Sequence, residues 1–437
     1  MNKRIVAGML LTTVVCMMLG GCGFTADKEN VKNSGAVESV MPGAEVSTEM
    51  TERDAEADNG VVQLKVWSEE DNFDMLNQMI DSFEQKYAGQ AKFEITLEQN
   101  ADSDTKDILL GDIHNGADVF PFADDQLSAM VAAGALYPVP NAEEVKSANL
   151  EESVSAASIN DILYAYPMTA DNGYFLYYDK NVLSDEDVQT MDGMLEALNA
   201  AGRSFSMELN SGWYLYTFFG NTGLEFGIND DGVTNYCNWN ATDGAIKGVD
   251  VAQAILNITT NPAFISQPDG DFITGVQNGT VSAGISGVWN AVSVREAWGD
   301  NYGAVKLPTY TVAGQQVQMS SFTGYKMGVN AYSKYPEWAA KLADWLTNEE
   351  NQTIRFEERN QGPSNTNAAA SDAVKQVPAI QAVIAQSEFG KLQRVGNSYW
   401  DACTAFGDTM AAGNPSGQDL QEIMDTLVDG IAASAAK

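Results

Sequence analysis

The sequence predicts an α/β protein with two lobes, each built on a mostly parallel sheet flanked by helices. Apolar residues at alternate positions, typical of strands, repeatedly precede apolar residues at three- and four-residue steps, typical of helices. Strands separated by helices of this length favour parallel pairing with right-handed crossovers. The stretch from residue 61 to residue 437 is too long for one ordinary hydrophobic core and suits two.

The first part of this stretch predicts the first lobe. Val62, Leu64 and Val66 alternate as in a half-buried strand over 61–67, and apolar residues at helical spacing follow over 73–87. The next expected elements are a strand at 93–97, a strand at 117–122 and a helix at 124–133, which Gly134 can terminate.

The pattern changes after Pro167, where a second α/β series begins. An apolar and aromatic strand is expected at 174–178, and Ser184 with Asp187 three residues later indicates a helix start. After this series, which runs to about residue 321, the sequence predicts a strand at 325–330, a helix at 335–348 and further long helices to the end.

The N-terminus predicts a lipoprotein export signal over residues 1–21. Lys3 and Arg4 precede an apolar run that ends in Leu19-Gly20-Gly21-Cys22, and a cysteine at the cleavage site supplies the thiol for lipid attachment. A membrane-spanning helix is the alternative, but the run is shorter than the ~18–20 residues that a bilayer requires. Lipidated Cys22 would hold the protein at the outer face of the cell membrane.

Residues 22–60 are predicted to form a disordered tether. They are rich in Asp, Glu, Ser, Ala and Gly and show neither helical nor strand periodicity. The whole chain has 24 basic and 60 acidic residues, a formal net charge of −36. Such a charge argues against nucleic acid or anionic lipid head groups as partners, so membrane contact is expected through the lipid anchor only.

Few cysteines and histidines are available for chemistry. Besides Cys16 in the signal and Cys22, the chain has only Cys237 and Cys403, without C-x-x-C spacing, and both are expected to be small buried apolar residues, with a disulfide as the alternative. His114 is the only histidine, which excludes a histidine-based zinc site. No metal, cofactor or catalytic residue is therefore predicted.

Four segments resemble the bacterial extracellular solute-binding proteins of ABC importers, specifically the maltose and maltodextrin type. They are LKVWSEED at 64–71, ADVFPFADDQLSAMVAAGALYP at 117–138, YPMTADNGYFLYYDK at 166–180 and KMGVNAYSKYPEWAAKLADWLTNEEN at 326–351. The resemblance implies a two-lobed clamp of the periplasmic-binding-protein type, with a first lobe of residues 61–169 plus 324–370 and a second of 170–323 plus 371–437. It also implies a monomeric receptor without enzymatic activity, which binds an α-glucan oligosaccharide between its lobes and delivers it to a membrane permease.

A sugar site needs aromatic rings for the apolar faces of pyranoses and fixed polar groups for their hydroxyls. Ligands of open α/β sheets bind beyond the carboxyl ends of strands, and there the first lobe offers Glu70, Asp71, Phe122, Asp125 and Gln126. Two of these have structural alternatives, since Asp125 can stabilise a helix N-terminus and Phe122 can pack in the core.

The segment that crosses between the lobes and the second lobe supply the other predicted ligand contacts. Asp171 and Asn172 lie where the lobes should meet, with turn formation as the alternative. Trp213, Trp289 and Trp400 each follow small or polar residues at the start of a helical run, and they match by resemblance the stacking aromatic residues of maltodextrin receptors.

Three further tryptophans are predicted to be core residues. Trp67 lies within a strand, and Trp338 and Trp345 lie on an apolar helical stripe. The chain also departs from the family, because receptors of this type often carry a tryptophan and an arginine where Phe122 and Gln126 stand. This departure bears more on the identity of the sugar than on the fold.

Two other functions fit parts of the sequence. A receptor for a different oligosaccharide or small solute would have the same fold, and it would differ only in the cleft. A lipid-anchored glycoside hydrolase would need a pair of carboxylates about 5 to 9 Å apart, which 60 acidic residues can supply by chance. A hydrolase would release new reducing ends, whereas a receptor would return its ligand intact.

Overall fold

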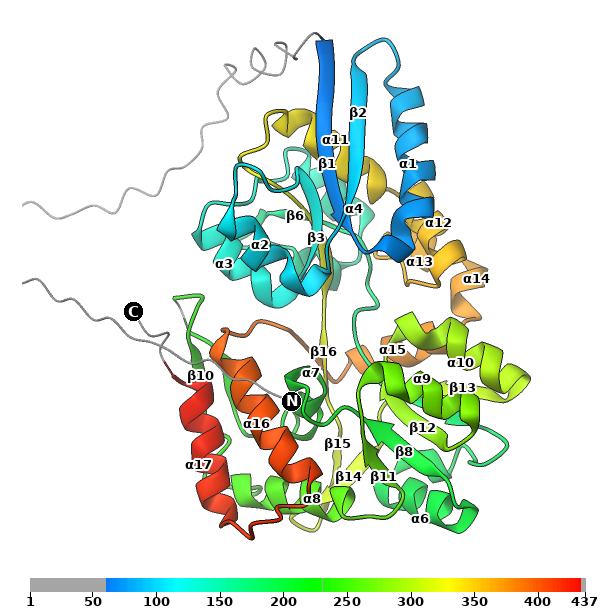
Figure 1. Cartoon of the computed structure of the whole chain (residues 1–437), viewed down its shortest axis with the longest axis vertical. Coiled ribbons are helices and arrows are strands. Elements are labelled where there is room, and N and C mark those ends of the chain that lie inside the picture. Colours follow the sequence, from blue (N-terminus) through cyan, green and yellow to red (C-terminus); the bar gives the residue numbers. More distant parts are fainter. Residues whose placement is uncertain (1–59, 230, 434–437) are drawn as a thin grey trace, which may run out of the picture. The chain divides into compact units, whose positions relative to one another are not determined.

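The computed structural model describes residues 60–229 and 231–433, in which two five-stranded sheets are the main elements (Figure 1). The strands of the first sheet are, in spatial order, β2 (Lys92–Gln99), β1 (Val61–Ser68), β3 (Val119–Ala123), β17 (Tyr325–Val329) and β6 (Ala165–Pro167). Those of the second are β11 (Phe264–Ser266), β8 (Ser204–Met207), β12 (Val281–Ser286), β7 (Phe175–Asp179) and β13 (Tyr302–Val305).

Both sheets are mixed, whereas the sequence predicted mostly parallel ones. β1 is parallel to β2 and β3, and β8 is parallel to β11 and β12, as expected for strands joined by helices. However, β17 is antiparallel to β3 and β6, and β7 is antiparallel to β12 and β13. The chain reaches β7 directly from β6 of the first sheet, and it reaches β17 after leaving β13 of the second sheet and passing through the short strands within residues 309–323. No helical crossover within one sheet therefore fixes the direction of either strand. The lobe boundaries themselves remain a prediction.

Helices connect and cover the strands. The earlier group is α1 (Phe73–Lys86), α2 (Thr105–Gly111), α3 (Leu127–Ala132), α4 (Ala142–Ala148), α5 (Glu151–Ala156), α6 (Met191–Ala201), α7 (Gly212–Leu215), α8 (Gly248–Thr259), α9 (Asp269–Asn278) and α10 (Ala291–Trp298). The later group is α11 (Pro336–Leu346), α12 (Glu349–Arg359), α13 (Thr366–Ala369), α14 (Asp372–Lys375), α15 (Pro378–Ser387), α16 (Ser398–Ala411) and α17 (Leu420–Ile431). None of the helices in the described part of the chain has the length and apolarity to cross a membrane.

Short strands complete the fold as two-stranded pairs. They are β4 (Ser158–Ile159) with β5 (Ile162–Leu163), β9 (Phe226–Ile228) with β10 (Asn235–Cys237), β14 (Thr309–Val312) with β15 (Gln315–Gln318), and β16 (Ser321–Thr323) with β18 (Gly390–Leu392).

The first core forms where the sequence predicted it. Leu76, Ile80 and Phe83 recur at helical spacing in α1 and are buried, so this face of the helix packs onto the sheet. Trp67 in β1 is only 6% exposed and belongs to the same core, which confirms its prediction. Trp338 is partly buried against this core.

The second sheet is covered on both faces. Leu176 and Tyr178 of β7 belong to one hydrophobic cluster, and the alternating Phe175 and Tyr177 belong to another. Because successive side chains of a strand point to opposite faces, helices must pack on each side of this sheet. This arrangement confirms the predicted α/β class.

Some helix starts differ from the predictions. The helix expected at 124–133 begins with the 3-10 turn η5 (Asp124–Gln126), and only then follows α3. Ser184 and Asp187 exchange the expected hydrogen bonds, but they open only a 3-10 turn, η6 (Asp187–Gln189). The helix α6 starts later, after Thr190, whose side chain accepts from the Gly193 amide.

Cys237 and Cys403 are both free, and burial raises the pKa of the Cys237 thiol to about 12. Cys403 is fully buried, as the sequence predicted, whereas Cys237 is only partly buried against the same core. The predicted signal, Cys22 and nearly all of the predicted tether lie outside the described residues.

Candidate ligand-binding cleft

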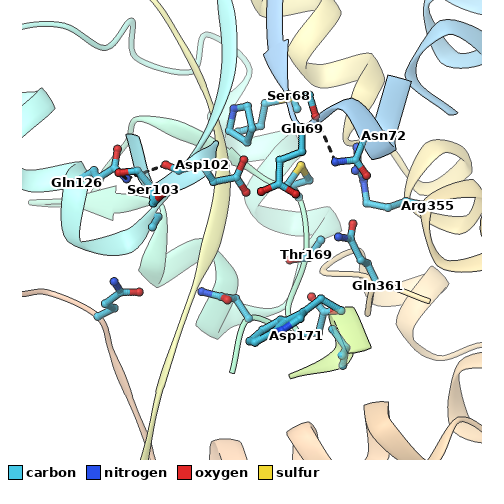
Figure 2. Close-up of a pocket in the computed structure, with 18 of the residues that line it drawn as sticks. Ser68, Glu69, Asn72, Asp102, Ser103, Gln126, Thr169, Asp171, Arg355 and Gln361 are labelled. Carbon is cyan, nitrogen blue, oxygen red and sulfur yellow. Dashed lines mark hydrogen bonds between the residues drawn. The ribbon is translucent and has the colours of Figure 1, made fainter. Parts of the chain in front are cut away.

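A cleft of about 630 Å³ lies between side chains of the first sheet and its neighbouring helices on one side and side chains of α7, α16 and the turn at 288–290 on the other (Figure 2). The segment that joins β6 to β7 also lines it. Its polar lining from the first sheet and its helices comprises Ser68, Glu69, Asn72, Asp102, Ser103, Asp125, Gln126, Arg355 and Gln361. The joining segment adds Thr169, Asp171 and Asn172, and the other side adds Trp213, Val288, Trp289, Gln393 and Trp400. Seven of the ten predicted ligand contacts therefore line one cleft.

The three predicted stacking tryptophans meet there although they are far apart in sequence. Trp213 in α7 stacks on Phe322 with ring centroids 5.7 Å apart, and Trp400 in α16 lies edge-on to Tyr399. The two helices approach closely at Gly212, where a Cβ atom would lie 2.9 Å from the Tyr399 ring. Trp289 is 41% exposed, so much of its ring is available to a ligand.

Carboxylates and one guanidinium form the polar wall of the cleft. Asp102 and Glu69 extend toward the same space in Figure 2, with Arg355 on the other side of Glu69. Arg355 is only 3% exposed, and its Nε and Nη2 have no hydrogen-bond partner among the described residues. Burial lowers its pKa to about 10, while the charges of Asp102 and Asp171 act in the opposite direction.

Burial raises the pKa of Asp102 to about 7, and repulsion from Glu69 adds to this effect while Arg355 opposes it. Asp171 has a pKa of about 6 because it is buried, although the Gly362 amide and Arg355 favour its ionised form. Both carboxyl groups therefore change charge close to neutral pH.

The contribution of Asp102 to the stability of the protein should consequently decrease as pH rises from about 4 to about 7. In this window the folded protein retains a proton on Asp102, whereas the unfolded chain has already lost it at the ordinary value of 3.8. Replacing Asp102 with Asn should make this decrease shallower, because the amide does not titrate. Melting temperatures of both proteins at pH 5 and pH 8 check this, and an unchanged pH dependence in Asp102→Asn would contradict it.

Two of the lining residues have their polar groups engaged by the protein. Gln126 donates to the Asp102 and Ser103 carbonyls and accepts from the Lys106 amide at 2.7 Å. Asp171 accepts from the Gly362 amide and is 3% exposed. Their main role is therefore to hold the loops of the cleft in place, since their polar atoms already bond to the protein backbone.

Phe122 does not lie in the cleft, so its predicted ligand contact is wrong. It is fully buried in the first core, in line with the alternative that the sequence left open. Pro121 and Ala123, its neighbours in β3, do line the cleft. Side chains alternate along a strand, so Phe122 points to the opposite face of the sheet.

Glu70 and Asp71 also lie outside the cleft, contrary to the prediction. β1 ends at Ser68, and Glu69 continues in extended conformation toward the cleft. The chain then turns in η3 (Glu70–Asn72), which leaves both carboxylates exposed to solvent. Asp71 instead pairs with Arg359, whose Nη2 lies 3.5 Å away.

Several lining residues were missed by the sequence analysis. Asp102 follows the end of β2 in the turn η4 (Asp102–Asp104), so the rule on carboxyl strand ends could have identified it. Arg355 lies in α12, a helix rich in charged residues, so its sequence context suggests a residue exposed on the surface. Gln361 and Gln393 follow α12 and β18 without any pattern that marks them.

No group of three or more His, Cys, Asp or Glu residues in the described part of the chain is arranged to hold a metal ion. The lining of the cleft presents aromatic surfaces, carboxylates, amides and one buried guanidinium. Such a lining can bind a polar ligand with apolar faces.

Comparisons with known proteins identify the family. A model described as bacterial extracellular solute-binding protein matches residues 78–382. The galactooligosaccharide-binding protein of Bacillus subtilis (strain 168) is 26% identical over 347 residues, which cover 75% of this chain and 79% of that protein. The maltooligosaccharide ABC transporter solute-binding lipoprotein of Streptococcus pneumoniae (strain ATCC BAA-255 / R6) is 25% identical over 76% of this chain and 80% of its own length.

A solved structure of a maltodextrin binding protein from L. casei BL23 without ligand has the same fold. Its TM-score is 0.73 at 23% identity, and the alignment covers 86% of this chain and all of that one. This similarity confirms the predicted two-lobed α/β clamp. Since the family model spans more than half of the sequence, the chain belongs to the family of bacterial extracellular solute-binding proteins.

Proposed function

We propose that the protein is the cell-surface, lipid-anchored receptor of a carbohydrate ABC importer and that it captures α-glucan oligosaccharides of the maltose and maltodextrin type. The observation that carries the proposal is the meeting of Trp213, Trp289 and Trp400 with carboxylates in one cleft. The receptor acts as a monomer, carries out no covalent chemistry and passes the intact sugar to a membrane permease.

The lining meets both requirements of a sugar ligand. The indole rings offer stacking surfaces for the C–H faces of pyranoses, and Glu69, Asp102, Asp125 and Asn172 offer polar groups for the hydroxyls. A sugar that contacts both lobes stabilises their closed arrangement, because its binding energy is greatest when both sets of contacts form. Closure in turn gives the permease a shape to recognise.

The class of oligosaccharide is the finer part of the proposal. The pneumococcal relative is named for maltooligosaccharides, and the Bacillus subtilis relative is named for galactooligosaccharides. A galactooligosaccharide receptor is therefore the second candidate. Receptors of both kinds would share this fold. Their sugars differ in the orientation of the hydroxyl groups, which the polar side chains of the cleft must match.

A thermal-shift panel separates these candidates. We expect maltose to maltoheptaose to raise the melting temperature, and galacto-, xylo- and manno-oligosaccharides to leave it unchanged. A ligand at one hundred times its Kd stabilises the folded state by about 2.7 kcal/mol, which a melting curve resolves readily. Stabilisation by the galactooligosaccharides alone would replace the α-glucan proposal with the second candidate.

The lipid anchor makes a separate prediction. Cys22→Ser should release the protein into the medium or block its processing, because acylation requires the thiol at this position. Cys16→Ser is the matched control, since Cys16 lies within the predicted signal and should not be needed for acylation. Labelling of cells with a radioactive fatty acid measures the outcome, and label retained on Cys22→Ser would refute the anchor.

A further inference from the structure

Asp269, the first residue of α9, accepts hydrogen bonds from four side chains. The donors are Tyr214 OH at 3.2 Å, Ser286 Oγ at 2.7 Å, Trp289 Nε1 at 2.7 Å and Asn290 Nδ2 at 2.7 Å. The two oxygens of a carboxylate can accept about four hydrogen bonds, so these four donors occupy all the acceptor sites of Asp269. Asp269 is also absent from the residues that line the cleft.

One of these donors is the most exposed tryptophan of the cleft. Trp289 lies in the 3-10 turn η8 (Val288–Asn290). Its ring covers Gly287, where a Cβ atom would lie only 2.0 Å from Cζ3. The Gly287 carbonyl in turn accepts from the buried Tyr177 hydroxyl at 2.8 Å. The Tyr177 hydroxyl thus holds the backbone of the turn, and the Asp269 carboxylate holds the indole ring through its N–H group.

We infer that Asp269 is a positioning residue that fixes the indole of Trp289 in the orientation in which it stacks on the sugar. The inference rests on the proposed function, because it concerns how the cleft presents a ring to a pyranose. An exposed side chain samples several rotamers, and ordering it on binding reduces affinity. The bond to Asp269 Oδ2 orders the ring before the ligand arrives, which is the advantage of preorganisation.

A merely structural role for Asp269 has to be separated from this one. An acidic residue in the first turn of a helix stabilises the helix through its dipole, and such an effect would not depend on Trp289. The two roles therefore differ in whether Asp269 and Trp289 are energetically coupled in ligand binding.

A double-mutant cycle measures this coupling, with titration calorimetry of maltotriose as the readout. Asp269→Ala is expected to weaken binding about tenfold, since it removes a charge-assisted hydrogen bond to the stacking ring. In the Trp289→Phe background, which retains an aromatic ring but has no N–H donor, Asp269→Ala should change affinity by less than about twofold. Thermal melts of each variant show what fraction is folded.

Tyr214→Phe is the matched control, because it removes a donor from the other oxygen of Asp269 and leaves the Trp289 bond in place. Its affinity should stay within about twofold of the wild type. Equal losses from Asp269→Ala in both backgrounds, or a tenfold loss in Tyr214→Phe, would overturn the inference.

The wild-type titration distinguishes the two proposals. If the wild type binds maltotriose and Asp269→Ala binds it equally well, the inference about Asp269 fails while the proposed function stands. If the wild type binds another oligosaccharide of the panel, the α-glucan assignment fails and the same cycle is run with that sugar. If it binds none of them, the proposed function is rejected and the inference with it.

Discussion

Replacing Trp289 or Trp400 with alanine is expected to weaken maltotriose binding by about 1 to 3 kcal/mol, roughly 5- to 150-fold in Kd. Both rings line the cleft, and neither is fully buried, so most of the loss should come from the stacking surface. The melting temperature of the ligand-free proteins should remain close to that of the wild type. Titration calorimetry beside thermal melts measures both quantities.

Trp345→Ala provides the control for a tryptophan outside the cleft. Trp345 is partly buried, its Nε1 donates to the Met79 carbonyl at 2.9 Å, and the Lys86 ammonium lies 4.2 Å from its ring. Its loss should lower stability by less than the ~3 to 5 kcal/mol of a fully buried tryptophan, and the folded fraction should bind sugar normally. Unchanged affinity in both Trp289→Ala and Trp400→Ala would show that the sugar stacks elsewhere.

The largest expected effect on stability comes from Trp239. This side chain is fully buried and stacks on Phe219, with ring centroids 3.9 Å apart. The centroid of the Phe226 ring lies 5.1 Å from that of Trp239. Trp239→Ala would leave a large cavity in the second core and should cost about 3 to 5 kcal/mol of unfolding free energy. Urea denaturation followed by circular dichroism measures this cost.

Trp239→Phe is the matched variant. It keeps an aromatic ring in the core, and it removes the buried Nε1 donor, for which the described part of the chain provides no hydrogen-bond partner. We therefore expect it to retain most of the stability that Trp239→Ala loses. If Trp239→Ala stays within about 1 kcal/mol of the wild type, this part of the core does not limit stability.

The fold was predictable where local pattern determines structure. The apolar spacing of α1 and the alternation of β1 each identify a buried face, because helices and strands repeat with different periods. The directions of β7 and β17 were not predictable from pattern alone. They depend on the passage of the chain from one sheet to the other, which no local periodicity records.

The site was predictable in part for a related reason. Trp213, Trp289 and Trp400 lie close behind small or polar residues at helix starts, and none of the three rings is fully buried. Phe122 could not be placed, because a shift of one residue along a strand moves a side chain to the opposite face. Arg355 was missed because its burial depends on packing between segments that are distant in sequence.

The most direct test of the account is a calorimetric titration of the purified protein with maltotriose, followed by chromatography of the sugar. We expect saturable one-to-one binding and recovery of the trisaccharide intact, since the cleft is proposed to capture α-glucans without cleaving them. Absence of binding would contradict the assignment of the ligand. Conversion of maltotriose to shorter sugars, in proportion to protein and time, would show that the protein is an enzyme and not a receptor.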